Sequence, residues 1–375
     1  MYAVRWSLLC LLAMPAVAAA GPSDSSSEGA QGAEEALDVP GVTVPGSLGR
    51  APELGGWSII NGTSATADIH PETGAVIVEL TGYEPLFSCS STLIAPDVVL
   101  LAAHCIDPEV YGAEVESVGW TRQTDVTLWL DGDNPEWPDD VVMASDWVMH
   151  DLWSIASLSY GLAENQDIAL LFLATPVTDV TPAVIPTFDE VDEINEGDAV
   201  TIVGWGHQTD DQSGAVGYKM YGESDLSRLA TYEFQVGQDE DAVRKCYGDS
   251  GGPTFRAFPS SSSTVKDRII GVTSHTYDVT GCSETGGVDT RVDYYWLWID
   301  SEMTARCQDG SRSWCETFGI MDPPVVEKTA GDLVDDIRLI GCTSAPAQPG
   351  QRSSALLALA GAALALVRIR APRRG

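Results

Sequence analysis

Positive charge is scarce in this chain. Its 375 residues include 20 lysines and arginines against 55 aspartates and glutamates, which gives a formal net charge of −35 at pH 7. Nucleic-acid binding needs a cationic surface that neutralises phosphates, so this balance argues against a nucleic-acid partner. The acidic excess is instead typical of an extracellular protein that charge repulsion keeps soluble, and we expect a monomer.

Metal-binding patterns are also missing. The eight cysteines form no Cys-x-x-Cys pair and no Cys/His set with the spacing of a zinc site. The acidic run at 131–140 lacks the spacing of an EF-hand loop, so we interpret it as a solvated insertion rather than a calcium site. We therefore expect no metal and no other cofactor.

The N-terminus "MYAVRWSLLCLLAMPAVAAAGPS" carries one arginine, then an apolar run, then small residues that end at Ala20. This order predicts a secretory signal peptide over residues 1–20. Export permits disulfides. Removal of Cys10 leaves an odd number of cysteines, so at least one is unpaired or chemically processed.

The composition and hydrophobic pattern of the chain change at Ile59. Residues 21–58 are rich in Gly, Ser, Pro and Glu and predict a flexible propeptide or linker. Beyond them, short apolar runs such as "GAVIVEL", "DIALLFL" and "AVTIVGWG" are separated by turn residues, which predicts an all-β body. "RVDYYWLWIDSEMTARC" has helical spacing and predicts a terminal helix near 293–305, followed by an acidic extension at 306–341.

Three short contexts carry candidate chemistry. A hydroxyl is a poor nucleophile until a base takes its proton, and that base must be held in the right tautomer. "LAAHC" supplies His104, and "NQDIALLFL" supplies Asp167 at the start of a strand-like run. "GDSGGP" supplies Ser250 in a loop whose glycines let backbone N–H groups point at a reacting carbonyl. Each context alone fits a structural role, but their conjunction indicates catalysis.

The segments "IINGTSA", "LLAAHC", "DIALL", "GWG" and "CYGDSGGP" together resemble the chymotrypsin/trypsin-like serine proteases. The resemblance implies two antiparallel six-stranded β-barrels with a short C-terminal helix, in a domain of residues 59–305. It implies a serine endopeptidase acting on proteins or peptides, with His104 as general base, Asp167 as its orienting carboxylate and Ser250 as nucleophile. The N–H groups of Gly248 and Ser250 would form the oxyanion hole.

The resemblance also implies disulfides and an activation step. It pairs Cys89 with Cys105 and Cys246 with Cys282. Cys307–Cys315 would then staple the extension, which leaves Cys342 for other chemistry. In this family a new N-terminus folds inward and pairs with the aspartate before the nucleophile, which here implies Ile59 and Asp249. Ser58 precedes Ile59, so an activator that cuts after lysine or arginine is not indicated.

The residue six before the nucleophile forms the pocket floor in this family, and here it is Arg244. Ser274, His275 and Thr276 stand where the resemblance places a pocket wall, and Thr276 should narrow the mouth. A cation at the floor and His275 on the wall suggest a preference for Glu or Asp at P1, the residue before the cleaved bond.

Other arrangements of the pocket charge remain open. Asp289, which follows Gly287 on the opposite wall, could neutralise Arg244. Arg244 could also point outward toward the run Asp239-Glu240-Asp241.

The tail at 342–375 joins "IGCTSAPA", a polar spacer, a short apolar run and an arginine-rich end. It resembles the C-terminal sorting signals of myxobacteria and related bacteria, which implies attachment at the cell surface through Cys342. A simple membrane tail that retains Cys342 is the alternative. Either way we expect an exported protein, secreted or anchored at the bacterial cell surface.

Two other functions fit parts of the sequence. A trypsin-fold protein that binds partners at a surface without proteolysis would share the fold, although such proteins usually lose a member of the triad, and all three positions are filled here. An esterase of the α/β-hydrolase type also contains Gly-x-Ser-x-Gly, but it needs helices between its strands and a later histidine. Only His275 follows Ser250, and the alternating helices are missing.

Overall fold

The computed structural model describes residues 59–130, 135–209, 215–261, 263–279, 281–282, 285–317 and 319–320. The expected signal peptide, propeptide and C-terminal tail lie outside the described residues, as does Cys342. Within the described ranges, no helix is both long enough and apolar enough to cross a membrane.

The first half of the described chain forms a closed barrel in the strand order β2-β3-β4-β7-β6-β5. Neighbouring strands are antiparallel throughout. The sequences of β4 and β7 are VVLL and ALLFL, and every side chain in them is buried, which explains why both read as continuous apolar runs. The strands are β2 (Thr73–Leu80), β3 (Leu86–Ala95), β4 (Val98–Leu101), β5 (Val115–Thr121), β6 (Val142–Met149) and β7 (Ala169–Leu173).

The second half forms another antiparallel barrel in the order β9-β10-β13-β12-β11-β8, closed because β9 also pairs with β8. A short strand, β1, adds to the edge of β9. The strands are β1 (Thr63–Ser64), β8 (Ala199–Gly204), β9 (Met220–Leu229), β10 (Glu233–Val236), β11 (Pro253–Ala257), β12 (Asp267–Thr276) and β13 (Gly287–Arg291). The expected fold class, two antiparallel six-stranded barrels, is confirmed.

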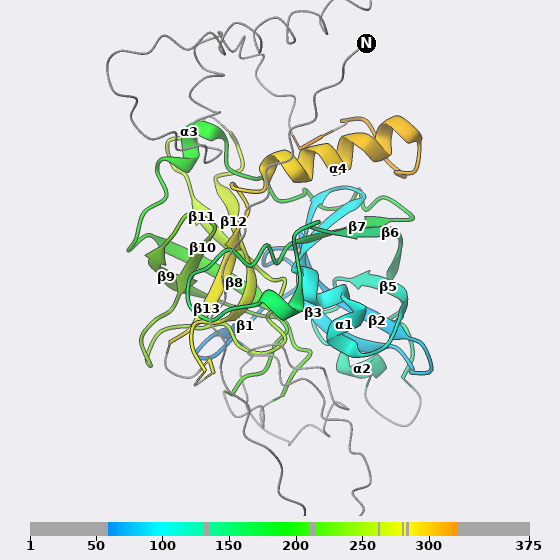
Figure 1. Ribbon diagram of the computed structural model, residues 1–375, viewed down its shortest axis with the longest axis horizontal. Helices are drawn as coiled ribbons and strands as arrows, with labels where there is room; N and C mark the ends of the chain where they lie inside the picture. Colours follow the sequence, from blue (N-terminus) through cyan, green and yellow to red (C-terminus); the bar gives the residue numbers. More distant parts are fainter. Residues whose placement is uncertain are drawn as a thin grey trace, which may run out of the picture.

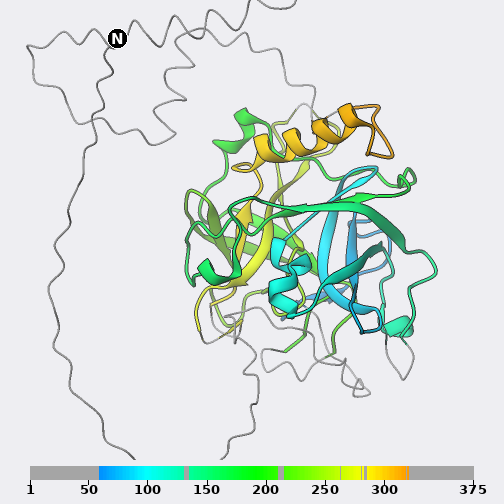
Figure 2. The same ribbon diagram turned by 45° about the vertical axis from the view of Figure 1, so that its right-hand side comes forward.

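Helices are few and short apart from the last one. The others are η1 (Ala103–Ile106), α1 (Pro108–Tyr111), α2 (Thr127–Leu130), η2 (Ile155–Ser157) and α3 (Phe188–Val191). The expected terminal helix is α4 (Trp296–Asp309), which lies across one end of the two barrels (Figures 1 and 2). It ends at Gly310, whose φ of 83° is the left-handed conformation that favours glycine. The domain boundary expected between residues 305 and 306 therefore falls inside α4.

α4 follows β13 of the second barrel but packs on the core of the first. Trp296, Ile299 and Met303 are its buried residues, and they belong to the hydrophobic cluster that contains β2, β4 and β7. The chain then turns back after the helix, and Cys307 in the last turn of α4 forms a disulfide with Cys315. The helix and its stapled turn thus link the two barrels that carry the candidate site.

Candidate active site

His104 lies in η1, directly after β4. It is 4% exposed, and its position is fixed by the disulfide between Cys105 and Cys89 of β3. The Cys105 carbonyl also accepts hydrogen bonds from Ser88 Oγ at 2.8 Å and from Tyr111 Oη at 2.7 Å. A histidine at the end of an apolar strand is therefore held on a rigid turn rather than on a loose loop.

Asp167 precedes β7 and meets His104 through both of its carboxylate oxygens. Oδ2 lies 2.7 Å from His104 Nδ1, and Oδ1 accepts the backbone N–H of His104 at 3.0 Å. Asp167 is fully buried. Burial alone would raise the pKa of Asp167, but the charge of His104 and the hydrogen bonds from His104 and Ser274 outweigh it and hold that pKa below its usual range. The carboxylate is thus kept ionised beside the imidazole.

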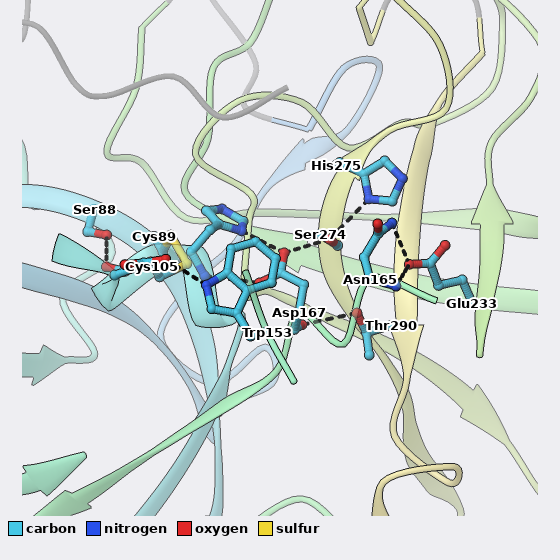
Figure 3. A network of polar contacts seen from close by, with 12 residues as sticks. Ser88, Cys89, Cys105, Trp153, Asn165, Asp167, Glu233, Ser274, His275 and Thr290 are labelled. Atoms are coloured by element: carbon cyan, nitrogen blue, oxygen red, sulfur yellow. Dashed lines mark hydrogen bonds and ion pairs between the residues drawn. A yellow bond between two sulfur atoms is a disulfide. The ribbon is translucent and has the colours of Figure 1, made fainter. Parts of the chain in front are cut away.

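The second barrel supplies further hydrogen bonds to Asp167, as Figure 3 shows. Ser274 of β12 donates its Oγ–H to Asp167 Oδ2 at 2.6 Å, and Thr290 of β13 donates to the Asp167 carbonyl at 3.0 Å. The His104–Asp167 pair is therefore fixed at the junction of the barrels by hydrogen bonds from residues of both barrels.

The loop that carries Ser250 approaches the same junction. The Ser250 carbonyl accepts the N–H of Ser90 at 2.9 Å, and Ser90 Oγ donates to the Gly248 carbonyl at 3.0 Å. A Cβ added to Gly251 would lie 2.3 Å from the Ser90 carbonyl oxygen and 3.2 Å from Ala102 N. Glycine is required there for the nucleophile loop to reach the strand ends that lead to His104.

Ser250 is 8% exposed and lines a hollow whose other lining residues all come from the second half of the chain. Within the described residues, no hydrogen bond joins its Oγ to His104. The N–H groups of Gly248 and Ser250 likewise donate to no described residue. Gly248 has a φ of 90°, and an added Cβ would lie 2.8 Å from Gly206 Cα, so this position requires glycine.

The pocket beside Ser250 differs from the expected one. The hollow has a volume of about 250 Å³, counting the open space at its mouth. It is lined by Lys245, Cys246, Tyr247, Ser250, Thr273, Ser274, His275, Thr276 and Gly287. Of the residues expected to form the pocket, Ser274, His275, Thr276 and Gly287 line it, and Asp289 lies behind it, bonded to Lys245. The disulfide from Cys246 to Cys282 ties this wall to the following loop.

The expectation that Arg244 forms the pocket floor is wrong. The Arg244 N–H donates to the Ile60 carbonyl at 3.0 Å, and its Nη1 donates to the Asp239 carbonyl at 2.8 Å. Successive side chains of an extended backbone point to opposite sides, so Arg244 turns toward the loop at Asp239 while Lys245 turns into the pocket. The sequence left open that Arg244 could point toward the run 239–241, and the contact with the Asp239 carbonyl agrees best with that alternative.

The proposed neutralisation of Arg244 by Asp289 is also wrong, because Asp289 pairs with Lys245. Lys245 Nζ lies 2.7 Å from Asp289 Oδ2, and their side chains are 1% and 0% exposed. Lys245 was not predicted as a pocket residue, because the resemblance assigned the pocket floor to one position, six residues before Ser250. The available signal was that two adjacent cations precede Cys246 and only one can face inward.

His275 does not present a cationic wall. Its Nδ1 lies 3.0 Å from Ser274 Oγ, and its Nε2 lies 3.1 Å from the Gly161 carbonyl oxygen. Burial lowers the pKa of His275, only partly offset by the Gly161 carbonyl and the charge of Asp167. The neutral form is therefore favoured, and the argument for an acidic P1 residue loses both of its cations.

Glu233 is a buried acid near the site that sequence reasoning overlooked. Its carboxylate accepts the side-chain amide of Asn165 at 2.9 Å (Figure 3). It also accepts the N–H of Ala163 at 2.6 Å, so it anchors the segment before Asp167. Burial raises the pKa of Glu233 to about 7, against the effect of these hydrogen bonds. The available signal was an acidic residue at the start of the strand-like run EFQV, which became β10.

Asp249 is fully buried immediately before Ser250. Its Oδ1 accepts the N–H of Gly206 at 2.8 Å, and its Oδ2 accepts the N–H of Cys246 at 2.9 Å. Burial raises the pKa of Asp249 to about 7, although both hydrogen bonds and the charge of Lys245 lower it. Ile59 is also fully buried, but no hydrogen bond or ion pair joins it to Asp249 within the described ranges.

The described part of the chain contains one cluster of potential metal ligands. This cluster, Cys89, His104 and Cys105, brings potential ligand atoms within 4.8 Å of one another. Both of its sulfurs belong to one disulfide, and His104 Nδ1 is bonded to Asp167. Ligation by sulfur at this cluster would require breaking the disulfide.

Known proteins are similar to this chain over the region of the two barrels. The Trypsin family matches residues 59–299 of the chain. The chain is 28% identical over 235 residues to the vitellin-degrading protease of Bombyx mori, which covers 58% of this chain and 76% of the relative. It is 25% identical over 263 residues to brachyurin of Leptuca pugilator, covering 65% and 98%. It is 28% identical over 258 residues to trypsin of Saccharopolyspora erythraea, covering 64% and 95%.

These matches and the paired barrels define a trypsin-fold domain. The chain belongs to the trypsin-like serine protease family.

Proposed function

We propose that this protein is a serine endopeptidase that cleaves peptide bonds through Ser250, His104 and Asp167. The observation that carries the proposal is the buried contact of 2.7 Å between His104 Nδ1 and Asp167 Oδ2, at the junction that also holds the Ser250 loop. A carboxylate on Nδ1 fixes the tautomer in which Nε2 can take a proton. The family match over residues 59–299 supports the same reaction.

In the proposed reaction, His104 Nε2 takes the hydroxyl proton as Ser250 Oγ attacks the scissile carbonyl. The oxygen of the tetrahedral intermediate would accept hydrogen bonds from the N–H groups of Gly248 and Ser250. Removal of one such donor typically raises the barrier by about 3 to 4 kcal/mol. His104 then gives its proton to the leaving amine, and water hydrolyses the acyl-enzyme by the same steps in reverse.

We further propose that the protein is made as a zymogen. Asp249 is a buried carboxylate with a raised pKa, so a nearby ammonium would stabilise its ionised form. Cleavage between Ser58 and Ile59 would create that ammonium on Ile59, which is already buried. The next residue, Ile60, accepts the N–H of Arg244 at its carbonyl oxygen. The pairing would hold the Asp249–Ser250 loop and, with it, the oxyanion hole.

Export of the protein is part of the proposal. Disulfides such as Cys89–Cys105 and Cys307–Cys315 form and persist in oxidising compartments, and small secreted proteases commonly carry them. The substrates would be proteins or peptides outside the cytoplasm. The sorting role of Cys342 stays a prediction, because that residue lies outside the described part of the chain.

The proposal is tested by measuring peptide hydrolysis by a protein whose N-terminus is set at Ile59. Residues 54–58 are replaced by Asp-Asp-Asp-Asp-Lys, so that enteropeptidase releases a chain beginning at Ile59. The cleaved protein should hydrolyse a mixture of unfolded proteins, whereas the uncleaved protein and cleaved Ser250→Ala should not. A cleaved, folded protein as inactive as Ser250→Ala would favour a surface-binding role without proteolysis.

A further inference from the structure

A lysine of the protein itself occupies the pocket beside the nucleophile. Lys245 lines the hollow that Ser250 faces, yet its side chain is only 1% exposed. Its Nζ donates to Asp289 Oδ1 at 2.8 Å, to Asp289 Oδ2 at 2.7 Å and to Thr254 Oγ1 at 2.6 Å. An ammonium has three N–H donors, so these contacts use all of them.

Thr254 completes a closed polar group behind the pocket. Its hydroxyl accepts from Lys245 and donates to Asp289 Oδ2 at 2.5 Å. Both Thr254 and Asp289 are fully buried, on strands β11 and β13, which lie on either side of β12 in the barrel wall. Each of these polar atoms therefore has a partner within the protein, and all three N–H donors of Lys245 are used.

The base of the pocket has no net charge. Burial lowers the pKa of Lys245 and raises the pKa of Asp289, and each shift is opposed by the charge of the partner. The pair carries a total charge of zero whether the shared proton rests on Nζ or on the carboxylate. A charged substrate side chain entering the hollow would lose its hydration and find no opposite charge.

The lysine stem also takes up space. A Cβ added to Gly287 would lie 3.3 Å from Lys245 Cβ and 3.8 Å from Lys245 Cδ, so the stem lies against the wall that glycine leaves open. Thr276 lines the hollow from the adjacent strand β12. The depth that a long side chain would need is thus already filled by the stem of Lys245.

We propose that Lys245 serves as an internal occupant of the primary pocket, so that the enzyme cleaves after small uncharged residues such as Ala, Ser, Thr and Val. This inference rests on the proposed function. Lysine and arginine are excluded at P1 because Asp289 is already neutralised. Aspartate and glutamate are excluded because Lys245 has no N–H left to donate, and large side chains are excluded by the stem.

Reciprocal variants test the pair. In the chain that begins at Ile59, peptides that differ only at P1 are compared by kcat/KM. For the wild type, Ala, Ser, Thr and Val should exceed Lys, Arg, Asp, Glu and Phe by at least about 100-fold. Lys245→Ser exposes Asp289 and should gain cleavage after Lys and Arg, together with inhibition by benzamidine. Asp289→Ser exposes the Lys245 ammonium and should gain cleavage after Asp and Glu.

Controls separate the possible failures. Lys245→Ser combined with Asp289→Ser should accept larger uncharged residues without a charge preference, and exposed Lys266→Ser should leave the profile unchanged. Diisopropyl fluorophosphate carries no P1 side chain, so each variant is first titrated with it; a wild type that does not react contradicts the proposed function itself. A reactive wild type that prefers a charged or large P1 residue overturns the pocket inference, even if every variant fails to fold.

Discussion

Asp97 and Arg312 lie 215 positions apart in the sequence and form a fully buried ion pair. Arg312 Nη2 donates to Asp97 Oδ1 at 2.6 Å, and Arg312 Nε lies 3.3 Å from Asp97 Oδ2. The same carboxylate accepts the N–H of Trp314 at 2.9 Å. The start of the acidic extension is thereby locked onto the first barrel.

Truncation of Arg312 should destabilise the domain. Arg312→Ala leaves Asp97 as a buried charge without its cation, which typically lowers the free energy of unfolding by about 3 to 5 kcal/mol. Urea unfolding of the Ser250→Ala protein, followed by tryptophan fluorescence, measures the loss without autolysis. Arg122→Ala is the matched control, because the Arg122–Asp179 pair is 32% and 68% exposed. Such surface pairs contribute at most about 1 kcal/mol. Equal stability of the two variants would show that the extension is not anchored by Arg312.

Asp249 should make the stability of the uncleaved protein depend on pH. Its pKa is raised from 3.8 to about 7, so the unfolded chain releases this proton at lower pH than the folded one. Stability from this group is therefore fully present below about pH 4 and is lost as pH rises to about 7, by roughly 4 kcal/mol in total. Urea unfolding of uncleaved Ser250→Ala at several pH values measures this slope, and Asp249→Asn in the same background should remove it.

Cleavage before Ile59 provides a second readout of the same group. A new ammonium beside Asp249 would lower the pKa of the carboxyl, so the cleaved protein should keep its stability between pH 4 and pH 7. An identical pH slope before and after cleavage would contradict the activation model, whatever the activity of the two forms.

The hydrogen bonds around Asp167 should contribute unequally to catalysis. Asp167→Asn removes the acceptor that fixes the His104 tautomer, and kcat should fall on the order of 10⁴-fold with little change in KM. Ser274→Ala removes one of several hydrogen bonds to a carboxylate that stays paired with His104, so kcat should fall only about 10-fold. Steady-state kinetics on one peptide decides the order. A loss in Ser274→Ala as severe as in Asp167→Asn would mean that Ser274, rather than His104, controls the carboxylate.

Glu233 should act on catalysis through the segment that leads to Asp167. Glu233→Gln keeps the shape of the side chain but turns an amide toward N–H donors, which should lower the free energy of unfolding by about 1 to 3 kcal/mol. We expect a reduced kcat, because the segment that leads to Asp167 shifts when Glu233 no longer anchors it. Exposed Glu223→Gln is the control. Normal kcat in Glu233→Gln would show that this buried acid only supports the fold.

The parts of the site that follow a local pattern were predictable from the sequence. The strands β4 and β7 are uniform apolar runs, so the residues that flank them, His104 and Asp167, could be placed at strand ends. The loop of Ser250 was recognisable because it needs glycine on both sides: Gly248 has a φ of 90°, and Gly251 approaches the Ser90 carbonyl.

The parts that depend on distant contacts were not predictable. Whether Arg244 or Lys245 faces the pocket is decided by the pairing of Arg244 with Ile60, far away in the sequence. The partner of Asp97 lies beyond the whole second barrel, and no local pattern indicates it. Burial decides the chemistry of Glu233 and Asp249 as well, and burial of an acid is settled only when the strands have packed.

The most direct test is covalent labelling of Ser250. The chain that begins at Ile59 is treated with diisopropyl fluorophosphate and mapped by mass spectrometry, with its uncleaved precursor and cleaved His104→Ala treated in parallel. A triad with an activated serine predicts one phosphoryl group on Ser250 of the cleaved protein and at most a trace in the other two. A folded, cleaved protein with unmodified Ser250, or with labelling that is the same in His104→Ala, would contradict it.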